Sequence, residues 1–275
     1  MLVRAARDGA THTVSELAIL SDVGGGWTNE DAYGQWTADS GDVVFVVADG
    51  VGGREGGEVA SRLAVATTLQ AYRESPAAWA AAKRLHHAVQ QANVVIHNRA
   101  LAVPELSRMA STLTAVVVSD GTASAVHVGD TRLYLVRGDA VRQLTKDHTV
   151  AGERARLRLA SGRSALGDPD RSMLTRSLGQ DLVAPLDRVS LRLLAGDRLV
   201  VCTDGVYTMV HEQELGDYCR DQAAKTACRS LIAAAKRRNA TDNLTVAVFA
   251  SSAGVQTPAP AGWRARLLGL LKRHD

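Results

Sequence analysis

The sequence predicts an α+β fold, in which strands and helices are grouped separately rather than alternating. Short β-branched runs bounded by turn residues recur between residues 16 and 250, as expected for strands. Helix-like stretches, with apolar residues every three or four positions, are instead clustered along the chain. Two of them follow each other directly, which disfavours an alternating parallel sheet.

The composition and its distribution predict one large domain with short extensions. The chain has 275 residues, of which 46% are hydrophobic and 22% charged, so it has enough apolar residues for a substantial core and is not disordered overall. We expect a polar leader over 1–15, the domain over 16–250, a Pro-containing linker over 251–261 and a tail over 262–275.

The net charge of +3 is confined to residues 261–275, because the other 260 residues are neutral overall. This argues against nucleic acid as a partner. Leucines and Trp263 share one helical face of the tail, and its basic residues flank them, which predicts a short amphipathic helix. Such a helix suits an anionic membrane or the groove of a partner protein. A helix folded back on the domain, or a frayed end, is an equal alternative.

The sequence indicates a cytoplasmic location. The apolar run Val43–Ala48 is far shorter than a membrane span, and the N-terminus has no apolar segment typical of a secretion signal. The three cysteines have no CxxC spacing, so we expect free thiols in a reducing compartment.

The strongest strand signals each lie beside an aspartate. They are Asp42–Ala48, Thr122–Val128, Arg198–Cys202 and Leu244–Phe249. Leu113–Val118 and Leu133–Val136 are further candidates, and the second is expected to pair with Val141–Leu144 across the turn at Arg137-Gly138-Asp139.

Three helices follow from the 3–4 spacing of apolar residues. Glu58–Arg73 is expected to bury Val59, Leu63, Ala66 and Leu69. A second helix is expected to open at Pro76 and to bury Trp79, Ala82, Leu85, Val89, Ala92 and Ile96. A third, over Gln222–Arg238, is expected to bury Ala224, Ala227, Leu231 and Ala235.

Four aspartates at strand ends predict a metal site. Asp49, Asp130 and Asp204 each follow a strand, and Asp242 precedes one. Each alone would more often be a turn residue, but together they can converge when the strands lie side by side. Converging carboxylates repel each other unless a cation is present, and oxygen ligands without His or Cys suit Mg²⁺ or Mn²⁺. Gly50 would allow a backbone carbonyl to approach the same ion.

In this order and spacing, the motifs resemble those of the metal-dependent type 2C serine/threonine protein phosphatases, and the resemblance covers about residues 16–250. The motifs are Asn29-Glu30-Asp31-Ala32, Ala48-Asp49-Gly50-Val51-Gly52-Gly53, Ser111-Thr112-Leu113, Val128-Gly129-Asp130-Thr131-Arg132, Leu144-Thr145-Lys146-Asp147-His148, Leu174-Thr175-Arg176-Ser177-Leu178-Gly179, Cys202-Thr203-Asp204-Gly205 and Thr241-Asp242-Asn243. The apolar Val51 after Asp-Gly is similar to the bacterial branch.

The resemblance implies a four-layer α–β–β–α sandwich with two central antiparallel sheets. It also implies two Mn²⁺ or Mg²⁺ ions, with Asp49, Asp204 and Asp242 as the catalytic ligands. Asp49 would bridge the two ions, the Gly50 carbonyl would bind one of them, and Asp204 and Asp242 the other. Asp130 and Asp204 would hold a third ion, as in bacterial members, while Glu30 and Asp31 would hold metal-bound waters.

The implied reaction is hydrolysis of phosphoserine and phosphothreonine by a water bridging the two ions, which attacks phosphorus. The partners would be phosphorylated proteins, substrates of a cognate serine/threonine kinase. No cysteine is needed for this chemistry, and His148 is interpreted as a structural hydrogen-bonding residue rather than the general acid.

One departure from the family pattern concerns the substrate phosphate. The family places an arginine two or three residues before Asn-Glu-Asp, where this chain has Trp27 and Gly26. Arg54 is the candidate that would bind the phosphate instead. The basic segment 152–179 corresponds to the family's flap, for which substrate contact and a solvated helix are equal alternatives. The missing arginine keeps open a second hypothesis, a phosphoprotein-binding regulatory module of the same fold with weak turnover.

Overall fold

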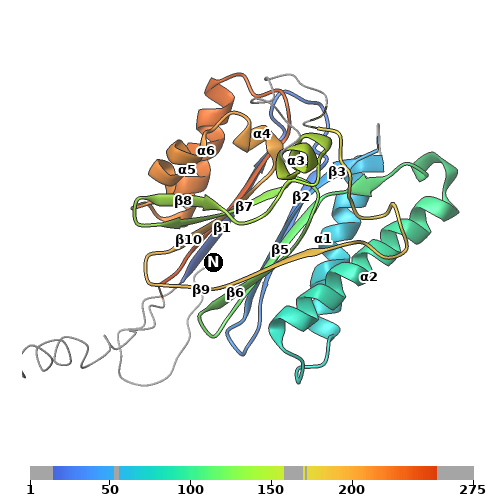
Figure 1. Cartoon of the computed structure of the whole chain (residues 1–275), viewed down its shortest axis with the longest axis horizontal. Helices are drawn as coiled ribbons and strands as arrows, with labels where there is room; N and C mark the ends of the chain where they lie inside the picture. Colours follow the sequence, from blue (N-terminus) through green and yellow to red (C-terminus); the bar gives the residue numbers. More distant parts are fainter. Residues whose placement is uncertain (1–14, 53–55, 158–169, 171, 253–275) are drawn as a thin grey trace, which may run out of the picture.

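The computed structural model describes residues 15–52, 56–157, 170 and 172–252. Two antiparallel sheets pack face to face, and helices cover both outer faces (Figure 1). The four-layer α–β–β–α arrangement expected from the sequence is therefore confirmed. The leader residues before Ser15, the linker residues after Ser252 and the tail lie outside the described residues.

Each sheet is built from strands distant in sequence. The first has the order β2-β3-β5-β6-β9, with the short β4 beside β3, and the second has the order β1-β11-β10-β7-β8. The strands of the first sheet are β2 (Asp31–Thr37), β3 (Val43–Val51), β4 (Ala110–Ser111), β5 (Leu113–Ser119), β6 (Thr122–Val128) and β9 (Asp187–Arg192). Those of the second are β1 (Glu16–Asp22), β7 (Arg132–Arg137), β8 (Ala140–Gln143), β10 (Arg198–Cys202) and β11 (Leu244–Ala250).

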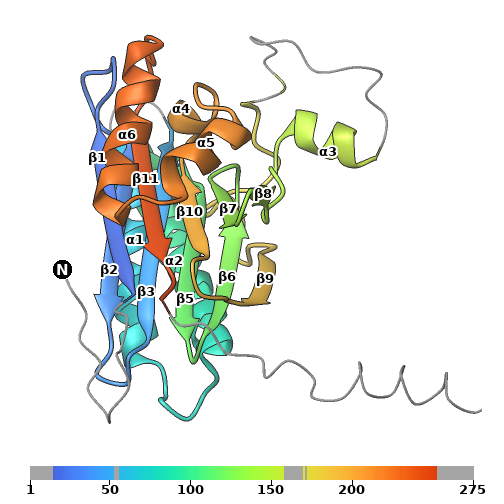
Figure 2. The same ribbon diagram turned by 90° about the vertical axis from the view of Figure 1, so that its left-hand side faces the viewer.

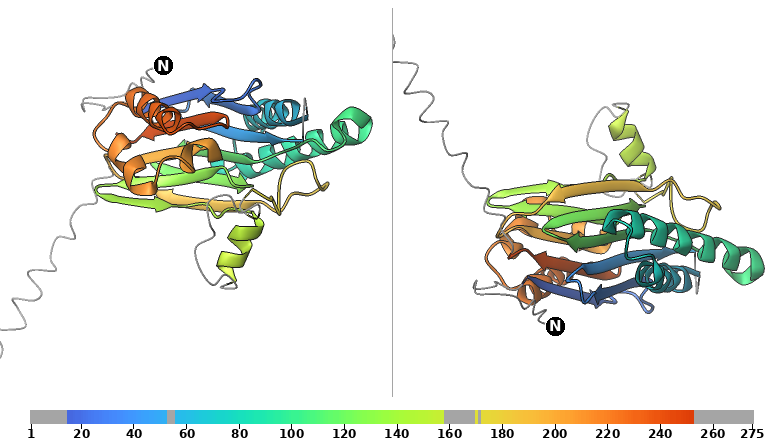
Figure 3. Two further views of the ribbon diagram at one scale, coloured as in Figure 1. Left: turned by 90° about the horizontal axis from the view of Figure 1, so that it is seen from above. Right: turned by 90° about the horizontal axis from the view of Figure 1, so that it is seen from below.

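The helices divide between the two sheets. The long helices α1 (Gly56–Glu74) and α2 (Ala81–Ala102) cover the first sheet, and a single 3-10 turn (Pro104–Leu106) follows them. The second sheet is covered by α4 (Asp204–Tyr207), α5 (Glu212–Cys219) and α6 (Ala224–Arg237). In contrast, α3 (Val150–Arg156) buries no residue and stands away from the sheets (Figures 2 and 3).

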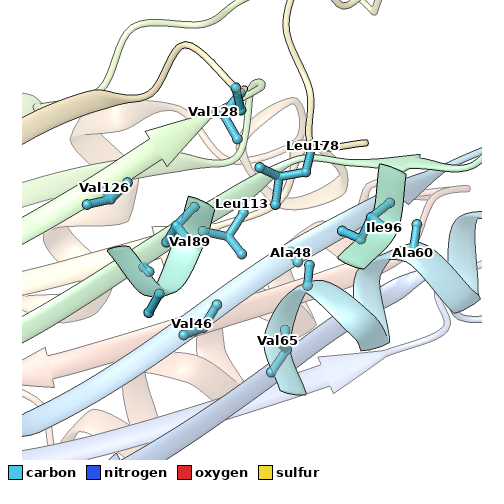
Figure 4. Close-up of a cluster of buried hydrophobic side chains, with 14 of the residues drawn as sticks. Val46, Ala48, Ala60, Val65, Val89, Ile96, Leu113, Val126, Val128 and Leu178 are labelled. Carbon is cyan, nitrogen blue, oxygen red and sulfur yellow. The ribbon is translucent and has the colours of Figure 1, made fainter. Parts of the chain in front are cut away.

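Alternation along β3 explains why four layers form. Val44, Val46 and Ala48 point to α1 and α2, in the apolar cluster of Figure 4. Val43, Phe45 and Val47 belong to the cluster between the sheets, where the rings of Phe45 and Phe249 stack with centroids 6.1 Å apart. A strand that is apolar on both faces needs a cover on both, which one sheet and one helical layer provide.

The strands beside aspartates are confirmed, and so is the β7–β8 hairpin, in which Arg137 pairs with Ala140. The sequence missed β1, β2 and β9. All of β1 is half-buried, and β9 alternates half-buried and exposed residues at a sheet edge, so neither shows the fully apolar run that identified the central strands.

Two helix predictions were wrong in detail. The second helix begins at Ala81, because Pro76–Trp79 forms a turn closed by a hydrogen bond from the Trp79 N–H to the Pro76 carbonyl. In α1 the predicted Ala66 is exposed and its larger partners are only half-buried. The buried face instead consists mainly of small residues, which let the helix lie close to β3 and α2: Gly56, Gly57, Ala60, Ser61, Ala64, Val65, Thr68 and Tyr72.

The described residues add two observations on location. No helix among them has both the length and the apolarity needed to cross a bilayer. Cys202, Cys219 and Cys228 are free and buried, and burial raises the pKa of each thiol to about 12. Such thiols stay protonated and are poor nucleophiles, as the sequence reading of Cys202 expected.

Candidate metal centre

The first half of the site lies at the edge of the first sheet. Asp31 at the start of β2 is the register partner of Asp49 near the end of β3. Glu30 immediately precedes β2, and its carbonyl accepts a hydrogen bond from the Gly50 N–H at 3.1 Å. Antiparallel pairing thus brings three carboxylates to one end of the strand pair.

The second half comes from the other sheet and is tied to the first by hydrogen bonds. Asp204 is the first residue of α4, just after β10. The preceding Thr203 donates its hydroxyl to Asp31 Oδ2 at 2.9 Å. Next to Asp242, the Asn243 Oδ1 accepts a hydrogen bond from the Glu30 N–H at 2.7 Å. These two contacts join the sheets where the carboxylates lie.

Asp130 lies in the connection between β6 and β7. Gly129 before it has φ +96°, and a Cβ there would lie 2.5 Å from the Thr112 side chain, so the turn requires glycine. The Tyr207 hydroxyl donates to Asp130 Oδ2 at 3.4 Å. Neighbouring Arg132 packs over the Tyr207 ring, 3.7 Å from its centroid. It also donates hydrogen bonds to both carboxylate oxygens of Asp147.

The carboxylates of the site have raised pKa values. Burial, followed by repulsion from the other acids, raises the pKa of Asp31 and of Asp130 to about 7 and that of Asp204 to about 6. The same causes hold the pKa of Asp49 well above its usual range, and burial with repulsion from Asp242 and Glu58 raises that of Glu30. The structure therefore brings together the residues that the sequence selected, with negative charge in excess.

Gly50 and Gly57 show how closely the backbone is packed at this point. A Cβ on Gly50 would lie 1.9 Å from the Gly57 carbonyl oxygen, and one on Gly57 would lie 2.0 Å from Glu30 Oε2. Side chains are therefore excluded at both positions. The start of α1 therefore packs directly against the Glu30 carboxylate.

The donor set fits a hard divalent cation. It contains carboxylate and carbonyl oxygens without His or Cys, which suits Mg²⁺ or Mn²⁺. Within the described part of the chain, no three His, Cys, Asp or Glu side chains form a group that could hold a metal ion. Ions of this kind keep several of their waters, so waters would complete the coordination that the protein oxygens leave open.

Arg132 does not neutralise the cluster. It lowers the pKa of Asp130 and of Asp204, but its guanidinium is already bound to Asp147. The charge of the cluster therefore favours bound cations.

Sequence reasoning missed several residues that hold the site together. Thr203 and Asn243 stand inside the quoted motifs, next to Asp204 and Asp242, so their motif position could have indicated a positioning role. Tyr207 had no such signal. His148 is buried, and its Nδ1 accepts a hydrogen bond from the Gly129 N–H at 3.1 Å, as expected of a structural histidine.

The residues at the expected phosphate-binding position are exposed. Trp27 is fully exposed, with 103% of its reference accessible surface. Its loop is held beside Asp242 because the Asn243 Nδ2 donates to the carbonyls of Val23 and Thr28 at 2.9 and 3.0 Å. Arg54, the expected substitute for the arginine, lies outside the described residues.

Part of the basic segment 152–179 is described, and its arginines are paired there. Arg156 and Arg176 both contact Glu153, and Arg176 also contacts Asp187. Arg154 pairs with Asp170. These ion pairs support the solvated-helix alternative for this part of the segment, since none of the three guanidiniums is without an acidic partner.

Comparison with known proteins agrees with this geometry. A family model described as protein phosphatase 2C matches residues 21–248. A serine/threonine phosphatase, stp, from Listeria innocua is 31% identical over 222 residues, covering 79% of this chain and 88% of that protein. The Mycobacterium tuberculosis serine/threonine phosphatase PstP/Ppp superposes with a TM-score of 0.77 at 28% identity, covering 87% of this chain and 99% of the other.

A second structure bears on the metal. The catalytic domain of serine/threonine protein phosphatase PstP, in complex with two manganese ions, superposes with a TM-score of 0.73 at 28% identity, covering 86% of this chain and 97% of the other. The chain is thus similar over nearly its whole domain to a protein that binds manganese.

Proposed function

Because this chain belongs to the protein phosphatase 2C family and is a serine/threonine protein phosphatase, we propose that the carboxylate cluster at the joined sheet ends is its metal-dependent active site. The observation that carries the proposal is the convergence of Asp31, Asp49, Asp130 and Asp204, buried with raised pKa values. Perturbed carboxylates gathered at one place are typical of functional sites.

The proposed ligands are those that the sequence selected. Asp49, the Gly50 carbonyl, Asp204 and Asp242 would hold two ions, and Asp130 with Asp204 would hold a third. Glu30 and Asp31 would support waters of the centre. The close packing of Gly50 against Gly57 supports this assignment, because it fixes the backbone between Asp49 and α1.

Mn²⁺ or Mg²⁺ bound here would polarise the phosphoryl group and lower the pKa of water. The chain's own residues keep the acids oriented for this task. Thr203 holds the Asp31 carboxylate by its hydroxyl. The backbone of Asp49 is fixed at both ends, since its N–H donates to Thr112 Oγ1 at 3.0 Å and its carbonyl accepts from the Thr112 N–H at 2.8 Å.

The regulatory-module hypothesis is less well supported. Its basis is the missing arginine, and Trp27 is indeed exposed where that arginine is expected. A site without turnover would not need a full set of buried acids, because such acids destabilise a fold unless cations compensate them. Arg54 stays our proposed phosphate ligand.

The direct test is hydrolysis of a phosphothreonine peptide. We expect Mn²⁺-dependent release of phosphate that a chelator abolishes and that added Mn²⁺ restores. Phosphate release that persists after chelation and dialysis would contradict a metal-dependent centre. Binding of the peptide without turnover, at saturating Mn²⁺, would favour the regulatory module.

We further propose phosphorylated proteins, made by a cognate serine/threonine kinase, as substrates, and a cytoplasmic place of action. The three free cysteines support a reducing compartment. The domain over 16–250 would carry the activity, and the tail over 262–275 would contact an anionic membrane or a partner protein. The leader and linker would have no catalytic part.

A further inference from the structure

A cavity of about 610 Å³ opens beside α3, and a second, of about 450 Å³, opens beside the candidate metal centre. We call the second the Val51 groove. Its wall includes Val51, His97, Leu101, Arg108 and Ser177. Val51 ends β3 and directly follows Gly50, so one wall of the groove lies next to the proposed active site.

The far wall of the groove is joined to the metal-binding strand by backbone pairing. Gly50 and Val51 pair with Ser111 and Ala110 of β4. A Cβ on Gly52 would lie 2.8 Å from Met109 Cα and 3.0 Å from the Arg108 carbonyl oxygen. Arg108 is therefore held at a fixed distance from the metal centre, although its side chain is exposed.

The remaining wall is held rigidly as well. Leu178 lies in the core with Ile96 and Leu113 (Figure 4), and its N–H and carbonyl both bond to Ser111. The Gly179 N–H donates to Asn93 Oδ1 at 2.8 Å. A wall fixed in this way is preorganised, so ligand binding would cost little ordering entropy.

Two polar groups in the groove have no partner among the described residues. Arg108 makes no ion pair or hydrogen bond with them, in contrast to Arg132, Arg154, Arg156 and Arg176, which are all paired. The Ser177 hydroxyl is buried and makes no hydrogen bond there either. A buried hydroxyl without a partner costs free energy, which a ligand group can recover. Val51 and Leu101 add exposed apolar surface, 44% and 74% accessible.

We propose that the Val51 groove binds the substrate polypeptide beside its phosphorylated residue, with Arg108 selecting an acidic group and Val51 with Leu101 selecting an apolar side chain. This inference rests on the proposed function, since it assigns the occupant of a surface next to that active site. Val51 is two residues beyond Asp49, and Gly52, which lies against the Arg108 backbone, is three residues beyond it. These spans are about 7 and 10 Å at ~3.3 Å per residue in a strand. In an extended peptide the acidic group would stand two to three positions from the phosphothreonine.

The test compares Arg108→Glu with Arg99→Glu, a matched charge reversal at an exposed residue near the end of α2 that does not line the groove. Each enzyme is assayed with Mn²⁺ on p-nitrophenyl phosphate and on phosphothreonine peptides with Glu or Lys two or three positions away. For the wild type we expect kcat/KM to be at least tenfold higher for the Glu peptide than for the Lys peptide.

Arg108→Glu should lower kcat/KM for the acidic peptides at least tenfold more than for p-nitrophenyl phosphate, and should reverse the preference toward Lys. Arg99→Glu should do neither. The groove assignment would be overturned if Arg108→Glu and Arg99→Glu changed kcat/KM equally, or if the kcat/KM of the wild type did not depend on the flanking charge. A wild type inactive on every substrate would instead reject the proposed function.

Leu101→Ser tests the apolar part of the Val51 groove. The substitution changes an exposed side chain and is therefore compatible with folding. Replacing an apolar flanking residue of the peptide by Ser should lower kcat/KM several-fold for the wild type and little for Leu101→Ser. Identical losses for both enzymes would show that the peptide does not contact this wall.

Discussion

The two ends of β3 each have an aspartate, and the structure treats these two carboxylates in opposite ways. Asp42, just before the strand, accepts a hydrogen bond from the Tyr72 hydroxyl at 3.3 Å and lies 3.7 Å from Arg84 Nη1. Arg84 also packs over the Tyr72 ring, 4.2 Å from its centroid. This end is a closed ion pair whose charges compensate each other.

Asp49, near the other end of β3, faces acids instead. Asp31, Asp130, Asp204 and Asp242 all raise its pKa by repulsion, in addition to burial. A charge buried with a partner on the same chain serves the fold, whereas charges buried without one require a ligand from outside. The difference separates structural from functional carboxylates, and the predictions below test it.

The largest effect on activity is expected at the Asp49 end of β3, where no basic side chain compensates the acids. Asp204→Asn and Asp242→Asn should each lower Mn²⁺-dependent kcat/KM about a thousandfold, because a weakened centre forfeits several kcal/mol of transition-state stabilisation, at ~1.4 kcal/mol per factor of ten. Circular dichroism should show an unchanged fold. Full activity of Asp204→Asn at limiting Mn²⁺ would refute the assignment of this residue.

A change at the Asp42 end of β3, where Arg84 compensates the charge, should affect stability and not catalysis. Arg84→Ala leaves Asp42 without its cation and removes the hydrogen bond to the Tyr72 carbonyl, at 3.0 Å. We expect a loss of about 3 kcal/mol in the free energy of unfolding, with kcat nearly unchanged in the remaining folded enzyme. Denaturant titration measures it, and Arg99→Ala is the exposed control. An unchanged midpoint would mean that this end is not held by its ion pair.

The metal-free protein should lose stability as the pH rises. For Asp31 and Asp130 the folded pKa of about 7 lies above the unfolded value near 4, so the folded state binds more protons between these values. The contribution of these two groups to the free energy of unfolding is fully present below pH 4 and is lost as the pH rises through 7. Between the two pKa values each group lowers the free energy of unfolding by about 1.4 kcal/mol per pH unit. Calorimetry at pH 5.5 and 8 with a chelator should show a lower Tm at pH 8, and Mn²⁺ should abolish the difference.

The sequence was informative where local pattern determines the outcome. Central strands such as Arg198–Cys202 are apolar on both faces, so their ends and the aspartates beside them could be read directly. The buried Arg84 could not be foreseen, because its role depends on Asp42 and on Tyr72, which are distant along the chain or on another helix. The same is true of Thr203, whose contact with Asp31 spans 172 residues.

The helices show the same limit. The buried face of α6 was predicted because its apolar stripe faces one sheet. In α1 the predicted stripe followed mainly the larger apolar side chains, whereas the buried face is made of small ones such as Ala60 and Ala64. Periodicity shows which residues are apolar but not which of them allow two elements to pack closely.

The smallest effect is expected at Trp27, the exposed residue beside the centre. Its loop is bound to Asn243, next to Asp242, so position 27 belongs to a loop that lies beside the acids. If no other residue binds the phosphate, Trp27→Arg should raise kcat/KM for a phosphopeptide about tenfold, since a charge-assisted bidentate contact contributes ~1.5–3 kcal/mol. The gain should come mainly through a lower KM.

Trp27→Ala is the control, because it removes the ring without adding a charge, and Gly26→Arg tests the neighbouring position. If Arg54 already binds the phosphate, Arg54→Ala should cost more than tenfold and Trp27→Arg should add little. A gain from Trp27→Arg and a loss from Arg54→Ala exclude each other. Once the metals have bound the phosphate, few of its oxygens remain free to accept hydrogen bonds from a second guanidinium group. If neither Arg54→Ala nor Trp27→Arg changes kcat/KM, the enzyme binds its phosphate through the metals alone. The Asp49 end of β3 would then provide both substrate binding and chemistry.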